Sequence, residues 1–534
     1  MTMEQITAHK RIIPDVNVGT QVLLGILFAC VTLFWGTQKW KNRHLSKLAS
    51  MFPGPMALPI IGNALEFLNS EPEDILSSMY RLGQNYKSPF RFWLGNRLCI
   101  LVAKPADLQI VLNNSKNLGK DEVYEFLQAV IGTGLIAAPV EKWKKTRKML
   151  TPSFIPKKLE RFEDIMNERA NILVQKIQEH SNSDHEINIY PYFLSASLDT
   201  FCEAGFGVRL ETQLDPKATF AESVIRASEL GAARIYKPWL HLDWIYERTS
   251  YAKKLNQEGE ALRGFAKKVI RECKRRLMKT KDSVIDNDNN NNKLSDCDDE
   301  DEKEHLLDVI FESREGASFN YSETDMIDEV ITFLIGGSET SAVTNCFCLL
   351  MLAMHPEFQE KVHKEQFNIF KGEDRPVTSE DMDRMEYTEQ VIKETLRMFP
   401  VVPLILRAVE EDLKITENFV LPAGAAVVIA PLQTHSDPAL WQEPEKFNPD
   451  NFSAENIQSR HKYAYIPFSG GARGCIGYRY AMKAMKTTIS TFIRHYRVAT
   501  TTKLEEIKLS TDLLIRSKDG WNMKLEPRIG TNPE

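Results

Sequence analysis

The chain has 534 residues, 43% of them hydrophobic, which is enough apolar material for a large buried core. Its formal net charge of −6 argues against a general nucleic-acid binder. The eight cysteines are scattered without a CxxC pair, which indicates a reducing compartment and neither a disulfide framework nor a zinc cage.

The first predicted element is an apolar segment. Val18 to Gly36 contains no charged residue, and as a helix rising ~1.5 Å per residue it matches the hydrocarbon thickness of a bilayer. It is longer than the apolar part of a usual cleaved signal peptide, and a buried core helix is the alternative. Basic residues predominate after it, which favours a cytosolic body. The sequence therefore predicts a short luminal N-terminus (1–17) and a single transmembrane anchor (18–38).

A basic, proline-rich linker is predicted over residues 39–62, because three prolines and two glycines between Phe52 and Asn63 exclude a helix there. The globular body then covers residues 63–534. Two β-rich runs flank Gly95-Asn96, a pair typical of a hairpin turn.

Helical patterns dominate from Pro105 to about Lys393. β-rich runs return between Val401 and Pro431, and a last hairpin is predicted around Asp519-Gly520. Because strands and helices do not alternate, we expect a mainly α (α+β) fold, not a Rossmann fold or a barrel. The segment 282–304 carries ten acidic residues against two lysines. We predict a disordered surface loop there, with an acidic interaction segment as the alternative.

One local match to a nucleotide-binding motif is rejected. GTGLIA, beginning at Gly132, fits a dinucleotide fingerprint, but no strand precedes it and Pro139 interrupts any following helix. No flavin or nicotinamide site is therefore expected, and electrons for any redox reaction would have to come from another protein.

The sequence FSGGARGCIG, from Phe468 to Gly477, surrounds Cys475 with four glycines and precedes a predicted helix. At a helix N-terminus, free N–H groups and a partial positive charge favour a thiolate. Glycine lets backbone amides approach the sulfur closely. An isolated thiolate of this kind suits an axial metal ligand, with a buried structural cysteine as the alternative.

This loop and three further motifs, in the same order, resemble those of the cytochromes P450. The loop resembles the haem-ligating signature F-x-x-G-x-R-x-C-x-G. The others are WKKTR (Trp143 and Arg147), GGSETS (Gly336 to Ser341) and ETLR (Glu394 and Arg397). The resemblance implies the cytochrome P450 fold, a helix-rich body with small β-sheets, and a haem b cofactor whose iron is bound by the Cys475 thiolate. O2 is the implied co-substrate.

The resemblance also implies roles for individual residues. Those expected at the haem and its propionates are Cys475, Arg473, Trp143, Arg147, Arg407, Phe468 and Gly337. Thr340 and Glu339 are the expected catalytic pair for proton delivery, although a back-bonding helix threonine is the alternative for Thr340. Glu394 and Arg397 are expected to form a buried structural ion pair.

Two positions depart from the family pattern. Asn451 stands where an arginine usually completes a cluster with the ETLR pair, so an amide must replace a guanidinium. The layout resembles animal microsomal members that hydroxylate fatty acids, many of which carry a glutamate that forms an ester with the haem. Here that position is Gly336, which has no side chain to form the ester.

The function implied is that of a microsomal monooxygenase that inserts oxygen into a lipophilic substrate: a fatty acid, a hydrocarbon, a lipid hormone or a foreign compound. Electrons would come from NADPH-cytochrome P450 reductase, with cytochrome b5 as a second candidate donor. The basic groups expected at the docking face are Lys144, Lys145 and Lys148, and Arg479, Lys483 and Lys486, with ordinary solvated basic surfaces as the alternative.

Two alternatives remain: an isomerase or dehydratase of the same fold that needs no external electrons, and a non-catalytic, membrane-tethered haem or lipid binder. The pair Glu339-Thr340 favours the monooxygenase, because rearrangement of a peroxide needs no proton relay.

Overall fold

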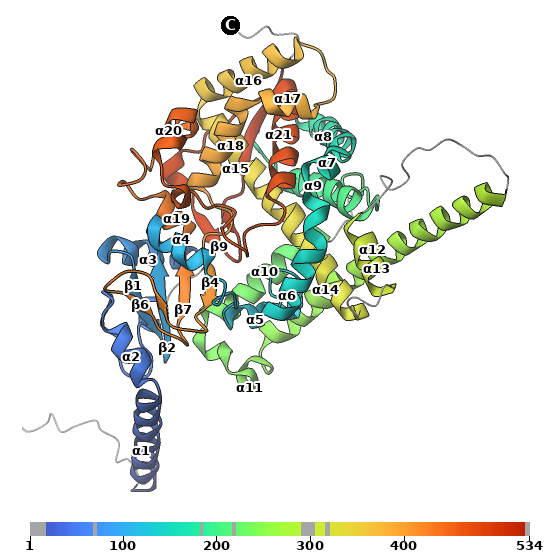
Figure 1. Ribbon diagram of the computed structural model, residues 1–534. Coiled ribbons are helices and arrows are strands. Elements are labelled where there is room, and N and C mark those ends of the chain that lie inside the picture. The colour runs from blue at the N-terminus through green and yellow to red at the C-terminus, as the bar shows by residue number, and fades with distance from the viewer. Residues whose placement is uncertain are drawn as a thin grey trace, which may run out of the picture.

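The computed structural model describes residues 18–67, 72–181, 185–215, 220–289, 305–315 and 321–528. Helices make up most of this part of the chain, as predicted, and they surround the central helix α15 (Figure 1). The α-helices are α1 (Val18–Lys41), α2 (Arg43–Ala49), α3 (Pro72–Asn85), α4 (Pro105–Asn113), α5 (Val123–Ile131), α6 (Val140–Leu150), α7 (Pro156–Glu160), α8 (Glu163–Ile177), α9 (Tyr190–Phe206), α10 (Phe220–Tyr236), α11 (Asp243–Tyr246), α12 (Ser250–Asn289), α13 (Leu306–Glu315), α14 (Glu323–Leu334), α15 (Thr340–Met354), α16 (Pro356–Phe370), α17 (Ser379–Arg384), α18 (Glu386–Met398), α19 (Pro431–His435), α20 (Ala454–Ser459) and α21 (Tyr478–His495).

The central helical stretch is assembled from three pieces. α14 begins with a capping box in which Ser322 and Asp325 satisfy each other's backbone N–H groups. A π-helical turn, Ile335–Glu339, joins it to α15. Among the described residues, Glu323–Met354 is a helical stretch long and apolar enough to cross a membrane, but 78% of its most apolar window is buried inside the protein. It is therefore the core helix, packed against α9, α18 and α21.

The largest sheet has four strands in the order β1-β2-β7-β4. β1 (Phe90–Leu94) and β2 (Arg97–Val102) form an antiparallel hairpin, and Gly95 at its turn has a φ of +64°. This confirms the hairpin predicted at Gly95-Asn96. The β-rich patch after Val401 is also confirmed, because it supplies β4 (Ile405–Ala408) and β7 (Ala426–Ile429).

The hairpin predicted around Asp519-Gly520 is wrong. Gly520 does lie in a turn, with a φ of +81°, but the strands on either side pair with other partners. β10 (Ile515–Ser517) pairs with β9 (Leu509–Thr511). β11 (Asn522–Pro527) pairs with β8 (Tyr496–Ala499) and with β3 (Ile187–Asn188). The remaining strands, β5 (Leu413–Lys414) and β6 (Val420–Leu421), pair with each other.

The predicted linker, residues 39–62, is packed more closely against the body than a spacer would be. It contains the end of α1 and all of α2, and Ala49 and Phe52 are buried in the core cluster that covers the large sheet. The amide of Arg91 donates to Pro53 O at 2.8 Å. In Figure 1, α1 extends away from the body beyond α2.

Two other predicted segments lie partly or wholly outside the described residues. The luminal N-terminus, 1–17, lies wholly outside them. Helix α12 continues to Asn289, so eight residues of the segment predicted as a disordered loop are helical. The rest of that segment, 290–304, is not among the described residues.

Candidate active site

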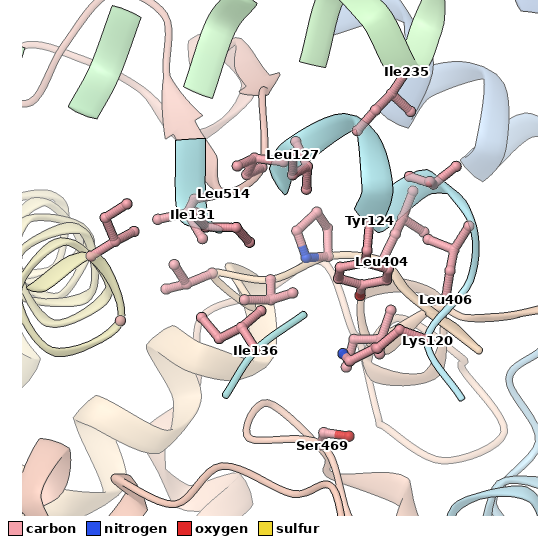
Figure 2. Close-up of a pocket in the computed structure, with 18 of the residues that line it drawn as sticks. Lys120, Tyr124, Leu127, Ile131, Ile136, Ile235, Leu404, Leu406, Ser469 and Leu514 are labelled. Carbon is pink, nitrogen blue, oxygen red and sulfur yellow. The ribbon is translucent and has the colours of Figure 1, made fainter. Parts of the chain in front are cut away.

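A cavity of about 1240 Å³ lies in the body and collects most of the predicted site residues along its walls. The Cys475 loop contributes to it, as do the π-helical turn with Thr340, helices α5, α6 and α10, and strand β4. Figure 2 shows that aliphatic side chains, among them Leu127, Ile131 and Leu514, surround the hollow, whereas the polar groups of Lys120 and Ser469 lie toward one side. Such a cavity can bind a largely apolar ligand.

The Cys475 loop is folded as its sequence predicts. The Cys475 amide donates to Phe468 O at 2.9 Å, and α21 begins directly after the loop, with Gly477 as its N-cap. Gly471 has a φ of +65°, and a Cβ there would lie 1.8 Å from Leu112 O. Glycine is therefore required at this position for both conformation and space.

The side chain of Cys475 is exposed to the cavity, and the groups around its sulfur favour the negative form, whereas its position deep among protein atoms opposes that form. Burial raises the pKa of the Cys475 thiol, while hydrogen bonds from the Gly477 and Tyr478 amides and the positive charge of Arg147 act to lower it. Arg147 also donates to Gly474 O at 2.9 Å, which ties α6 to the loop. The predicted donors are present, but in the protein chain alone burial has the larger effect.

Three cations converge on the cavity beside this loop. The guanidinium of Arg473 lies 4.2 Å over the Trp143 ring and donates to Leu118 O and Ala138 O at 3.2 and 3.1 Å. Burial, together with repulsion from Arg407 and Arg147, lowers the pKa of Arg473 to about 9. Burial and the charges of Arg407 and Arg473 lower the pKa of Lys120 well below its usual value.

These cations have unused hydrogen-bonding capacity. The Nη1 atoms of Arg407 and Arg473 are buried and find no hydrogen-bond partner within the described part of the chain. Unpaired buried donors of this kind are costly unless a ligand supplies an acceptor. The arrangement therefore favours a ligand that carries carboxylates. The sequence identified Arg407 and Arg473 but missed Lys120, which meets Arg407 through an isolated β-bridge that no local pattern reveals.

The predicted catalytic pair lies where the π-helical turn joins α15. Thr340 Oγ1 donates to Gly336 O at 3.0 Å, which is the back-bonded geometry of the alternative interpretation, while Thr340 also lines the cavity. Glu339 lines the cavity as well, yet only 1% of it is exposed and it forms a buried ion pair with Arg516. Sequence reasoning missed Arg516, which lies 177 residues further along the chain.

The two glycines of the π-helical turn have different surroundings. A Cβ added at Gly336 would have Ile136 Cδ1, 3.9 Å away, as its only near neighbour, so this position is open. A Cβ at Gly337 would lie 2.2 Å from Cδ2 of Phe201. Although Gly337 also lines the cavity, close packing against α9 explains why glycine is needed there.

This contrast gives a matched pair of variants. We expect Gly337→Ala to lower the free energy of unfolding by about 1–3 kcal/mol, because Phe201 must move to admit the methyl group. Gly336→Ala should leave stability unchanged or raise it slightly, since alanine is the better helix former. Thermal unfolding followed by circular dichroism measures both, and equal shifts for the two variants would contradict this assignment.

The predicted structural ion pair is present. Glu394 and Arg397 are both buried, and two hydrogen bonds of 2.8 Å join them. Asn451, at the departing position, donates its amide to Glu394 Oε1 at 3.1 Å. Arg460 donates to Asn451 O at 3.0 Å and lies 3.8 Å over the Trp441 ring. A guanidinium from another position thus completes this cluster.

Comparison with known proteins agrees with this geometry. The family model described as cytochrome P450 matches residues 52–521. Cytochrome P450 4c3 of Drosophila melanogaster is 34% identical over 516 residues, 96% of this chain and 95% of its own. Human cytochrome P450 4V2 is 34% identical over 474 residues, with 88% and 89% covered. Cytochrome P450 4c21 of Blattella germanica is 31% identical over 494 residues, with 92% and 95% covered.

The fold and the cysteine loop thus define a haem-thiolate oxidoreductase of the monooxygenase class. The chain belongs to the cytochrome P450 family. The three relatives are animal members whose names all begin with the number 4: 4c3, 4V2 and 4c21. The family uses haem with a cysteine thiolate ligand, and O2. The residues present fit this cofactor, because the buried Nη1 atoms of Arg407 and Arg473 are unpaired donors of the kind that propionates satisfy.

Proposed function

We propose that this cytochrome P450 inserts one oxygen atom from O2 into a lipophilic substrate, using two electrons from NADPH delivered through a reductase. The overall reaction consumes two protons, and the second oxygen atom leaves as water. The observation that carries the proposal is the mainly apolar cavity shared by Cys475 and the Glu339-Thr340 pair. Fatty acids, hydrocarbons, lipid hormones and foreign apolar compounds are the candidate substrates.

In this proposal Cys475 ligates the haem iron, and the bound haem supplies the oxygen chemistry. The side chains of Arg473, Arg407 and Arg147, with Trp143 beneath Arg473, hold the propionates. We add Lys120 to this group because it lines the same cavity and lies near Arg407 and Arg473, whose charges, together with burial, lower its pKa. Glu339 and Thr340 hold and move the protons that the reaction consumes.

We propose that the reductase, or cytochrome b5 as a second donor, docks on the surface beside the Cys475 loop. Lys144, Lys145 and Lys148 are exposed on α6, as is Arg479 at the start of α21. The other two predicted docking residues, Lys483 and Lys486, point into the protein, so we no longer include them in the docking surface. Lys483 pairs with Glu163 at 2.9 Å, and Lys486 is buried in an ion pair with Glu389.

We also propose that α1 is a single-pass anchor in the endoplasmic reticulum membrane, with residues 1–17 in the lumen and the body on the cytosolic face. Its 24 residues would span about 36 Å at ~1.5 Å per residue. Leu23 and Leu33 are 72% and 69% exposed, so this helix has apolar surface for membrane lipid to cover. Lys39 and Lys41 in its last turn favour the cytosolic side.

Microsomes that contain the chain and a P450 reductase test these proposals together. With the candidate lipids as substrates, a hydroxylated product should form only when NADPH and reductase are both present. Product formation without NADPH and reductase would instead support an isomerase or dehydratase. The absence of any product would support a non-catalytic binder. Protease added outside intact vesicles should degrade the body; its protection would contradict the orientation.

A further inference from the structure

The C-terminal hairpin β9–β10 contacts Glu339, one of the predicted catalytic pair, through a buried cluster of charged groups. Arg516, on β10, forms an ion pair with Glu339 and a second with Asp512 Oδ2 at 3.2 Å. Tyr190, on α9, donates its hydroxyl to Glu339 Oε1 at 3.5 Å. None of the three charged side chains is more than 8% exposed, so solvent screens them little.

This cluster borders the reaction cavity. Both Glu339 and Asp512 line it, as does Thr340, the residue after Glu339. The pairing of Arg516 with Ser510 across the β9–β10 ladder fixes the backbone from which the guanidinium extends. Glu339 belongs to the π-helical turn. Arg516 therefore links this turn to β10, which lies far away in sequence.

A buried carboxylate at this position needs a partner. An isolated carboxylate in the interior would neutralise or destabilise the fold, because burial disfavours its charged form. Although burial acts to lower the pKa of Arg516, the charges of Glu339, Tyr190 and Asp512 raise it, so the guanidinium stays charged. Arg516 thus holds Oε1 of Glu339 in one place, while the second carboxylate oxygen, Oε2, has no hydrogen-bond partner among the described residues.

Asp512 is the second carboxylate that contacts Arg516. Burial, opposed by Arg516 and aided by the negative charges of Glu229 and Glu339, raises the pKa of Asp512 to about 6. Below that pH, Asp512 is mostly neutral and competes less with Glu339 for the guanidinium of Arg516. Above it, two carboxylates share one guanidinium. The other titratable groups facing the cluster are Tyr190 on α9, Glu229 on α10 and Cys346 on α15.

We propose that Arg516 is the positioning residue for proton delivery in this enzyme, holding Glu339 beside Thr340 at the cavity wall, and that Asp512 sets how tightly Arg516 holds it. This rests on the proposed function, in which Glu339 and Thr340 handle the protons. Neither Arg516 nor Asp512 needs to touch the substrate. Loss of the positioning should release reduced oxygen as hydrogen peroxide (O2 + 2e⁻ + 2H⁺) in place of product and water.

The decisive comparison is Arg516→Met against Arg516→Lys, in the full-length holoenzyme with reductase, NADPH and lauric acid as the probe. We expect Arg516→Met to keep the carbon-monoxide spectrum and NADPH consumption. Product per NADPH should fall by about tenfold or more, a part of the ~10²–10⁴-fold that a positioned acid contributes, with a matching rise in peroxide. Arg516→Lys should recover part of the product yield, because it restores the charge but not the fork of donors. Arg497→Met, at an exposed arginine on β8, is the control and should behave as wild type.

Three further readouts separate positioning from general stability. The double variant Arg516→Met/Glu339→Gln should be no more uncoupled than Glu339→Gln alone, since Arg516 acts through Glu339. The solvent deuterium isotope effect on product formation should rise in Arg516→Met. In the wild type, product yield should fall as the pH rises through about 6, because ionised Asp512 then competes with Glu339 for Arg516, and in Asp512→Asn this pH dependence should disappear.

Wild-type product yield and isotope effect in Arg516→Met would overturn the inference. Should Arg516→Met fail to fold, Arg516→Lys decides: intermediate yield with an intact carbon-monoxide spectrum supports the inference, and wild-type yield overturns it. Failure of the proposed function would be seen differently, as the absence of NADPH-dependent product in the wild-type enzyme with every candidate lipid.

Discussion

Cys475→His should abolish the red-shifted carbon-monoxide band that ferrous haem gives with a thiolate ligand. The sulfur lies in the loop before α21 and receives hydrogen bonds from the Gly477 and Tyr478 amides, and an imidazole cannot reproduce its negative charge. Monooxygenase activity should fall below detection. A difference spectrum of the reduced protein with and without carbon monoxide measures this directly, and a persisting band in folded protein would make the ligand assignment wrong.

Cys99 provides the matched control, because it also lines the cavity. It lies on β2 without a glycine loop or a helix N-terminus, and burial raises the pKa of its thiol to about 11. This thiol stays neutral and is a poor iron ligand. Cys99→Ala should therefore keep the band, and its loss there would mean that the spectrum reports general damage to the cavity.

Short motifs predicted the parts of the site that are built locally. The Cys475 loop and the pair Glu394-Arg397 each lie within ten residues of sequence. Their geometry could therefore be predicted from the glycine content of the loop and from the i, i+3 spacing of the pair on a helix. The hairpin at Gly95-Asn96 was predictable for the same reason. Four such motifs in order then predicted the family and, through it, the fold.

Features that depend on distant partners could not be predicted. Lys483 and Lys486 resemble surface charges in the sequence, yet they pair with Glu163 and Glu389 from other helices. The turn at Gly520 was recognised, but a turn does not state which strands will pair, and here its two flanking strands enter different sheets. Arg516 escaped notice because nothing in its neighbourhood points to Glu339.

The substitution at Asn451 shows how such a partner changes the meaning of a motif. The sequence indicates only that an amide must replace a guanidinium in the cluster around Glu394. In the structure Asn451 keeps the hydrogen bond to Glu394, and Arg460, nine residues later, approaches the cluster and stacks on Trp441. A second positive charge, in addition to that of Arg397, is thus supplied next to this cluster from outside the expected motif.

Glu394 and Arg397 should be the positions outside the haem ligand at which substitution does most damage. All five N–H donors of Arg397 are used: two bind Glu394, and the others bind the carbonyls of His435, Pro444 and Lys446. Removing Glu394 leaves a buried guanidinium without its counter-ion, and removing Arg397 leaves a buried carboxylate and three unpaired carbonyls. We expect Arg397→Met and Glu394→Gln each to cost about 3–5 kcal/mol, so that little haem-containing protein is recovered.

Arg397→Lys separates charge from geometry. Lysine keeps the charge but has three donors on a single nitrogen, so it cannot bind the Glu394 carboxylate and three separate carbonyls at once. The control is Arg375→Lys, at an arginine that also grips a carboxylate, Asp381, with two hydrogen bonds but is 36% exposed. Asp381 itself is only 4% exposed, but it keeps its hydrogen bonds from Thr378, and lysine keeps the positive charge at a position that water reaches, so the cost should be about 0–1 kcal/mol. The temperature at which the haem absorbance is lost measures both variants. We expect this temperature to fall strongly in Arg397→Lys and only slightly in Arg375→Lys, because the arginine is buried in the first case and partly exposed in the second. Equal decreases would show that the buried network does not stabilise the haem-binding fold.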